Sequence, residues 1–270
     1  MLSQVDGILF QGGGVSLSFE YEFASTAKYI VESVIELSDK KMKNIAIWGT
    51  CLGFELLNQI IEGNFDLEYF KATYELDNTE NIDIDSLKKS KLYSKFTKND
   101  FINISNKKVL NENHFRGISQ EFYNYSKYIK LFFKVLTKNT DDENKEYIES
   151  IEAFDYNIFG TQSHPEKTTY DTKLKDAAAS SISSISISRI FSTTFIEKAS
   201  LSIINKNIKE ENIFEYLRFK KIEENLSNLF NIKSKYNSFE LRQINPRKKL
   251  PIPYKSGTLY FIYSKINNNI

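Results

Sequence analysis

The chain has 270 residues, of which 41% are hydrophobic and 26% are charged, so it can bury enough surface to form one large globular domain or two small ones. Its 36 basic and 35 acidic residues leave a net charge of +1, which argues against nucleic acid or an acidic membrane surface as a partner. One cysteine excludes an internal disulfide framework, one cysteine with two histidines predicts no metal site, and neither a membrane-spanning stretch nor a signal-peptide pattern is found.

The first 63 residues alternate between apolar runs and amphipathic periods. The apolar run at residues 5–10 ends in three glycines, which predicts a buried strand followed by a loop. Apolar residues at helical spacing predict a helix over 23–37, and a second strand is expected at 44–48. A helix over 52–62 follows, with Gly63 as its C-cap. This order predicts a parallel sheet covered by helices.

The middle of the chain gives weaker signals. Residues 64–119 are rich in Asn, Lys and Asp and predict loops and short strands, with a helix near 86–96. Helical spacing predicts a helix over 121–136, and the polar stretch "TKNTDDENK" predicts a turn. Paired strands are expected at 147–154 and 157–162.

The remaining residues differ in style from the first half. Residues 176–199 are serine-rich but keep apolar side chains on one helical face, which favours a long helix over the alternative, a low-complexity linker. Beyond residue 200 the patterns predict a helix over 214–230, a basic loop at "NPRKKLPIP" and an edge strand within 257–263. The expected division is a domain of residues 1–200 and a C-terminal extension of 201–270.

The only cysteine, Cys51, lies in "AIWGTCLGFELL", between a predicted strand and a predicted helix. A lone cysteine is most often a small buried hydrophobe. A Gly-x-Cys-x-Gly turn, however, is the pattern of a nucleophile elbow, which presents its central side chain at the end of a sheet. The following helix dipole favours a thiolate, and the amide of Leu52 can face an oxyanion above the sulfur. The setting therefore predicts a nucleophile that iodoacetamide labels quickly near neutral pH.

A nucleophilic cysteine needs a base, and the chain offers only His114 and His164. His164 lies in "GTQSHPEK", directly after a predicted strand, and Glu166 follows two residues later. Such a strand end can aim an imidazole at a neighbouring strand end while the carboxylate binds its other nitrogen. The alternative is a surface loop that contains a histidine by chance.

Three stretches together resemble a known family. "DGILFQGGGVSL", "GTCLGFE" and "HPEK" are similar to segments of the gamma-glutamyl hydrolases of the class I glutamine amidotransferase-like superfamily. The resemblance implies an α/β fold, a flavodoxin-like three-layer sandwich with a mostly parallel central sheet. It implies a triad, which would be Cys51, His164 and Glu166, and no cofactor. The oxyanion hole would use amides of Leu52 and of the glycine loop, at Gly13 and Gly14.

The resemblance also suggests substrate contacts. The segment that begins with the nucleophile looks like Cys-Leu-Gly-x-Gln in amidotransferases and like Cys-Leu-Gly-Phe-Glu in gamma-glutamyl hydrolases. This chain has Glu55 at the last of these positions and so resembles the hydrolases. Gly12 and Glu55 would contact substrate, as would His114 in "NENHFRGIS", although a lone histidine could equally be a structural hydrogen-bonder. The family usually has proline where Gln11 stands and an aromatic residue at the position before His164, so substrate fit may differ.

The implied activity is hydrolysis of gamma-glutamyl amide bonds in folylpoly-gamma-glutamate (pteroyl-poly-gamma-glutamate) or a related gamma-glutamyl peptide, in a lysosome, a vacuole or outside the cell. The sequence leaves open whether the protein forms a homodimer. The alternatives are a glutaminase subunit of a synthase and a truncated, inactive remnant that only binds. Family members begin with a further strand, helix and strand, so we expect an N-terminally incomplete sheet, an open edge beside residues 5–10 and reduced stability.

Overall fold

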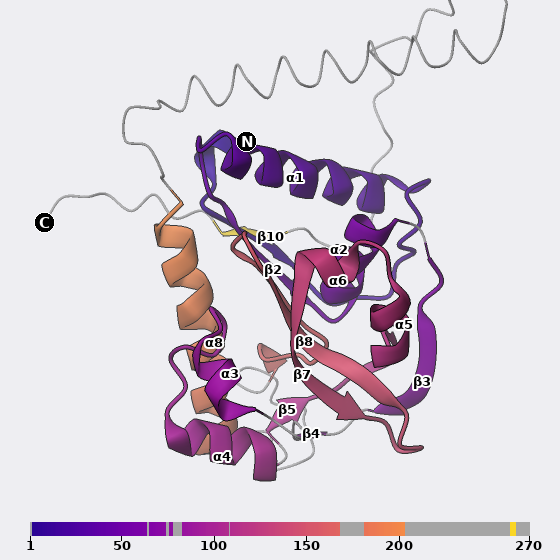
Figure 1. The fold of residues 1–270 in the computed structure, drawn as a ribbon, viewed down its shortest axis with the longest axis vertical. Coiled ribbons are helices and arrows are strands. Elements are labelled where there is room, and N and C mark those ends of the chain that lie inside the picture. The colour runs from indigo at the N-terminus through magenta and orange to yellow at the C-terminus, as the bar shows by residue number, and fades with distance from the viewer. Residues whose placement is uncertain are drawn as a thin grey trace, which may run out of the picture.

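The computed structural model describes residues 2–63, 65–73, 76–77, 83–107, 109–167, 181–202 and 260–262. A six-stranded sheet in the order β10-β1-β2-β9-β8-β7 forms its centre (Figure 1). The three inner strands β1 (Gly7–Phe10), β2 (Ala46–Thr50) and β9 (Ile158–Thr161) are parallel to one another. Their carboxyl ends meet at one edge of the sheet, which is where ligands bind in folds of this kind.

The outer strands complete a mixed sheet. β8 (Glu146–Ala153) pairs antiparallel with β9, and β7 (Phe133–Thr140) pairs antiparallel with β8. On the other side, β10 (Tyr260–Ile262) pairs antiparallel with β1. Four strands therefore run in one direction, and β8 and β10 run in the other. The expected mostly parallel sheet is confirmed.

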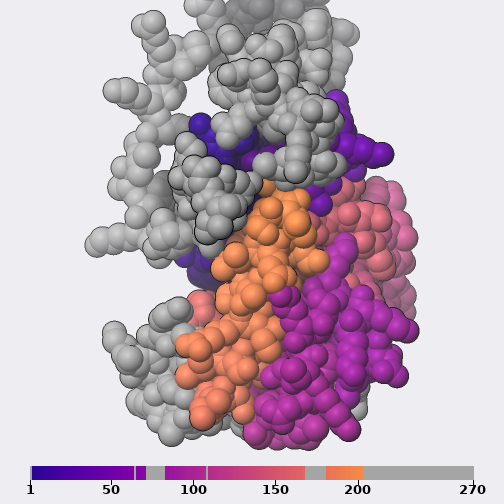
Figure 2. Space-filling view, turned by 90° about the vertical axis from the view of Figure 1, so that its left-hand side faces the viewer, coloured from indigo at the N-terminus to yellow at the C-terminus, as the bar shows by residue number. Residues whose placement is uncertain are grey.

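Helices cover both faces of the sheet, and the alternation of side chains along the strands explains why. Ile47 and Ile158 join the core under α1 (Glu22–Asp39) and α2 (Leu52–Glu62), whereas their neighbours Trp48 and Phe159 join a second core under α8 (Ile182–Ser200). The second core also holds side chains of α3 (Ile84–Lys88) and α4 (Lys98–Asn106). Figure 2 shows α8 running along this face beside that segment. The predicted three-layer sandwich is thus confirmed.

Short elements fill the region between α2 and β7. Two antiparallel ribbons pair β3 with β6 and β4 with β5. The remaining elements are a short helix at the N-terminus, those four strands and two helices before β7: η1 (Leu2–Gln4), β3 (Glu68–Thr73), β4 (Leu76–Asp77), β5 (Leu110–Asn111), β6 (His114–Gly117), α5 (Gln120–Tyr125) and α6 (Ile129–Phe132). Among the described residues, no helix has the length and apolar character that crossing a bilayer requires.

Most elements of the first half match the sequence predictions, but the helix expected over 121–136 is wrong. The chain forms the short helices α5 and α6 there and then enters β7 at Phe133. The reason is tertiary: β7 forms a long hairpin with β8 around a turn in which the Asp141 carboxylate accepts amide hydrogen bonds from Glu143 and Lys145. This pairing outweighs the helical spacing of the apolar side chains.

Other expectations are corrected in part. The helix near 86–96 is only α3, and α4, which begins with a capping box at Thr97, had no prediction. The predicted helix over 176–199 is α8, although residues 176–180 lie outside the described residues, as do the helix over 214–230, the basic loop and most of the extension. The open edge expected beside β1 is occupied by β10, so that expectation is wrong.

Candidate active site

The turn between β2 and α2 has the backbone of a strained elbow. Cys51 has φ 50° and ψ −107°, a region that side-chain-bearing residues rarely adopt. The flanking glycines are required by close backbone contacts. A methyl group on Gly49 would lie 2.5 Å from the carbonyl oxygen of Gly53, and one on Gly53 would lie 2.0 Å from that of Phe10. The glycines therefore let α2 approach the strands closely enough to hold the turn.

The Cys51 thiol is buried, with 6% of the residue exposed. Its sulfur lies 3.9 Å from the backbone carbonyl oxygen of Asn113, to which the thiol donates a weak hydrogen bond. Burial raises the pKa of Cys51 to about 12, and the nearby carboxylate of Glu55 adds to the rise, while the Leu52 amide opposes it. Desolvation therefore outweighs the expected helix-dipole effect and favours the neutral thiol over the thiolate.

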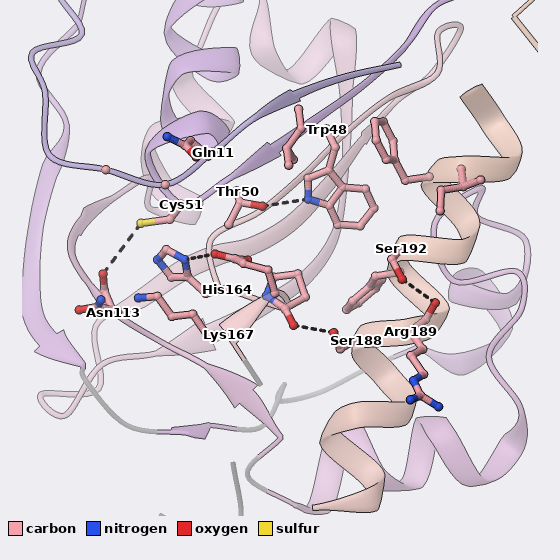
Figure 3. Close-up of a pocket in the computed structure, with 18 of the residues that line it drawn as sticks. Gln11, Trp48, Thr50, Cys51, Asn113, His164, Lys167, Ser188, Arg189 and Ser192 are labelled. Carbon is pink, nitrogen blue, oxygen red and sulfur yellow. Dashed lines mark hydrogen bonds and ion pairs between the residues drawn. The ribbon is translucent and has the colours of Figure 1, made fainter. Parts of the chain in front are cut away.

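His164 follows β9 and lies beside Cys51 at the same edge of the sheet (Figure 3). Its backbone amide donates to the carbonyl oxygen of Asn111 at 2.8 Å, which fixes the residue. Its Nδ1 lies 2.7 Å from Oε1 of Glu166, so Nδ1 donates to the carboxylate, and in the neutral imidazole Nε2 carries the lone pair. An imidazole in this tautomer can accept a proton from a thiol.

The glycine loop after β1 closes over both residues. A methyl group on Gly12 would lie 2.5 Å from Cε1 of His164 and 3.4 Å from Cβ of Cys51. One on Gly13 would lie 3.3 Å from the Leu52 side chain, whereas one on Gly14 would meet nothing within 4 Å. Because its residues have no side chains, the backbone of this loop lies close to Cys51, to His164 and to the start of α2.

A cavity of about 790 Å³ opens in front of these groups. Cys51, His164, Glu166 and the three loop glycines line one part of it, and side chains of α8 line another (Figure 3). Lys167 also lines it and lowers the pKa of Cys51. The sequence pattern predicts no role for Lys167 or for α8. The lysine could have been found from its place in "HPEK", but only the folded chain brings α8 to the site.

Two of the predicted substrate contacts lie elsewhere. Glu55 and His114 are buried and do not line the cavity. Glu55 accepts a hydrogen bond from the Gln162 amide at 3.3 Å, and burial raises its pKa to about 7. Burial also lowers the pKa of His114, whose Nδ1 donates to the carbonyl oxygen of Arg116. Their assignment as substrate-binding residues stays a prediction.

A set of buried acidic groups surrounds His114. Its Nε2 lies 3.1 Å from a carboxylate oxygen of Glu112, and burial raises the pKa of Glu149 well above its ordinary range. The Ser163 hydroxyl donates to Glu149, which gives a structural reason for serine at this position. Within the described residues, no group of three or more His, Cys, Asp or Glu side chains could hold a metal ion.

The fold and this edge define an α/β sandwich in which a thiol on a strand-to-helix elbow faces a histidine held by a carboxylate. A family model, "Glutamine amidotransferase class-I", matches residues 1–176. The chain therefore belongs to the class I glutamine amidotransferase family.

Curated relatives of this chain carry the name gamma-glutamyl hydrolase. Gamma-glutamyl hydrolase B of Dictyostelium discoideum is 28% identical over 97% of this chain and 77% of its own length. The human gamma-glutamyl hydrolase is 28% identical over 74% of this chain and 61% of its own length, and gamma-glutamyl hydrolase 1 of Arabidopsis thaliana is 29% identical over 63% and 48%. Among solved structures, a glutamine amidotransferase from Thermotoga maritima aligns with 71% of this chain and 77% of its own at 12% identity and a TM-score of 0.40.

Proposed function

We propose that this protein hydrolyses gamma-glutamyl amide bonds by thioester chemistry, with Cys51 as nucleophile, His164 as general base and acid, and Glu166 as the group that orients His164. The observation that carries this proposal is the geometry at the sheet edge where the Cys51 turn lies. A thiol and an imidazole lie side by side in one cavity, and the 2.7 Å contact with Glu166 assigns Nδ1 of His164 to the carboxylate and leaves Nε2 as the nitrogen that can serve the thiol. The names of the relatives point to the gamma-glutamyl class of substrate.

The raised thiol pKa favours a reaction that starts from the neutral thiol over one that starts from a thiolate–imidazolium pair. With a pKa of about 12, the sulfur of Cys51 holds its proton at neutral pH. Nε2 of His164 therefore takes that proton as the sulfur attacks the gamma-carbonyl carbon. The resulting oxyanion would lie near the backbone amides of Leu52 and of the glycine loop, at Gly13 and Gly14, which are the donors we propose for it.

The remaining steps return the enzyme to its starting state. The carbon–nitrogen bond breaks, and the leaving amine takes the proton from His164. The same nitrogen then removes a proton from water, whose oxygen attacks the thioester carbon. The carbon–sulfur bond breaks, the glutamyl carboxylate leaves, and the proton returns to the sulfur of Cys51. These steps use only side chains of this chain, backbone amides and water.

The direct test measures glutamate release from gamma-glutamyl dipeptides and from a pteroyl-poly-gamma-glutamate, with ammonia release from glutamine as the comparison. We expect turnover of the gamma-glutamyl amides, poor turnover of glutamine and no turnover by Cys51→Ala. Faster turnover of glutamine would favour a glutaminase instead. A Cys51→Ala variant as active as the natural chain would overturn the mechanism.

A further inference from the structure

The cavity beside the Cys51 turn has a larger volume than the reacting groups occupy. Its volume of about 790 Å³ lies in the range of about 300–1,000 Å³ that holds a whole drug-sized ligand, whereas a single glutamyl group is much smaller. Cys51 and the glycine loop line one end only. The remaining space can hold another part of the substrate, and the lining side chains indicate the chemistry of that part.

The part of the cavity away from Cys51 has an apolar wall, beside which Ser188, Arg189 and Ser192 of α8 also line the cavity. Trp48 and Phe195 line it, with their ring centroids 6.1 Å apart, and Phe191 packs edge-on against Trp48 at 5.7 Å. Leu9 and Ile196 extend this wall. The three aromatic side chains are each no more than 6% exposed, so the wall is held by packing on the sheet and keeps its shape.

The catalytic geometry indicates which half of the substrate meets this wall. The amine must take its proton from His164, so it leaves on the side of Cys51 where the imidazole lies. The cavity continues from His164 to α8, whose Ser188 hydroxyl donates to the carbonyl oxygen of Pro165 at 2.6 Å. This bond ties the helix to the loop that carries His164. The groups beyond the leaving nitrogen therefore extend toward the apolar wall.

From this arrangement we infer that the protein prefers gamma-glutamyl amides whose leaving amine carries a large apolar, preferably aromatic, group. The inference rests on the proposed function and narrows it. A leaving amine with a phenyl ring would bury that ring against Trp48, Phe191 and Phe195, which a leaving glycine or glutamate cannot do. Arg189, an exposed cation among the lining residues, can pair with the α-carboxylate that phenylalanine, glycine and glutamate leaving groups all carry, so the apolar wall is what separates phenylalanine from glycine.

The test compares gamma-glutamyl-phenylalanine, gamma-glutamyl-glycine and gamma-glutamyl-glutamate as substrates of the full chain. We expect kcat/KM for the phenylalanine compound to exceed the values for the other two by about tenfold or more, because burying one aromatic side chain changes transition-state binding by that order. Equal or reversed preference would overturn the inference and leave the proposed function intact. Absence of glutamate release from all three compounds would contradict both.

A matched pair of variants on α8 tests whether the apolar wall is the source of the preference for an aromatic leaving group. Ser192 and Thr193 are both exposed, but only Ser192 lines the cavity. Ser192→Trp fills the space next to the aromatic wall, so it should lower the ratio of kcat/KM for the phenylalanine and glycine compounds by about tenfold. Thr193→Trp places the same bulk one residue away and should keep the ratio of the natural chain. Identical ratios in the two variants would show that the wall does not hold the leaving group.

Discussion

The pKa of Cys51 leads to a prediction that separates two kinds of cysteine enzyme. A preformed thiolate reacts quickly at neutral pH, whereas a buried thiol with a pKa of about 12 does not. The substitution Glu55→Gln tests how much the neighbouring carboxylate contributes to the pKa of Cys51. Glu55 has a pKa of about 7, and its charge raises the pKa of Cys51. Glutamine keeps an oxygen that can accept the hydrogen bond from Gln162 but carries no charge.

The expected magnitude follows from the shift. Raising the thiol pKa from 9.0 to about 12 lowers the thiolate fraction at pH 7 by about 1,000-fold. A thiolate of higher pKa is intrinsically more nucleophilic, by about 20-fold over such a range. Alkylation of the folded protein should therefore be roughly 50-fold slower than that of the same cysteine in the unfolded chain.

The assay is the rate of iodoacetamide labelling between pH 6 and about 10.5, with the chain unfolded in urea as the reference. Because Cys51 is the only cysteine, total labelling reports it alone. Steric occlusion would slow labelling equally at every pH and leave the apparent pKa near 9.0, whereas the raised pKa keeps the rate rising beyond pH 10.

The contribution of Glu55 has a definite sign. Below pH 7 its carboxyl is mostly protonated, so the natural chain and Glu55→Gln should react alike. Above pH 7 the natural chain carries the extra negative charge and should react more slowly than the variant. A folded protein that reacts as fast as the unfolded chain at pH 7, with a plateau above that pH, would refute the reasoning and indicate a thiolate–imidazolium pair.

Five further substitutions test the site and its scaffold. His164→Asn should lower kcat by about 1,000-fold, whereas Glu166→Gln, whose side chain is half exposed and only orients the imidazole, should lower it by about tenfold; the reverse order would contradict the assigned roles. Gly12→Ala pushes a methyl group against His164 and should cost about 100-fold in kcat, whereas Gly14→Ala meets nothing and keeps its amide, so steady-state kinetics should show at most a few-fold loss. Gly53→Ala meets the carbonyl of Phe10 and should lower the free energy of unfolding by about 3 kcal/mol in urea titration; an unchanged midpoint would show that α2 can shift freely.

Local sequence was sufficient where the deciding contacts lie close together in the chain. The elbow could be predicted because glycines at 49 and 53 permit one particular approach of strand and helix around Cys51. The pairing of His164 with Glu166 could be predicted because the two side chains are separated by a single proline. The helices α1 and α2 follow from apolar periodicity alone.

The remaining features depend on contacts between distant residues. In place of the helix expected over 121–136, the chain forms α5, α6 and the start of β7, because β8 offers β7 a pairing edge, and β10 pairs with β1 from more than 200 residues away. No sequence pattern near Glu55 indicates that its side chain is buried outside the cavity and accepts a hydrogen bond from Gln162. Such outcomes are set by long-range packing, which local propensity does not encode.

The sequence by itself therefore determined the class of fold, the elbow and the histidine–carboxylate pair, because these follow from backbone freedom, periodicity and short spacings. Only the tertiary structure decided the direction in which the pKa of Cys51 shifts and the character of the cavity. Desolvation by burial raises the thiol pKa, and α8 brings Phe191 and Phe195 to the far wall. Both effects arise from surfaces that exist only after distant segments have packed together.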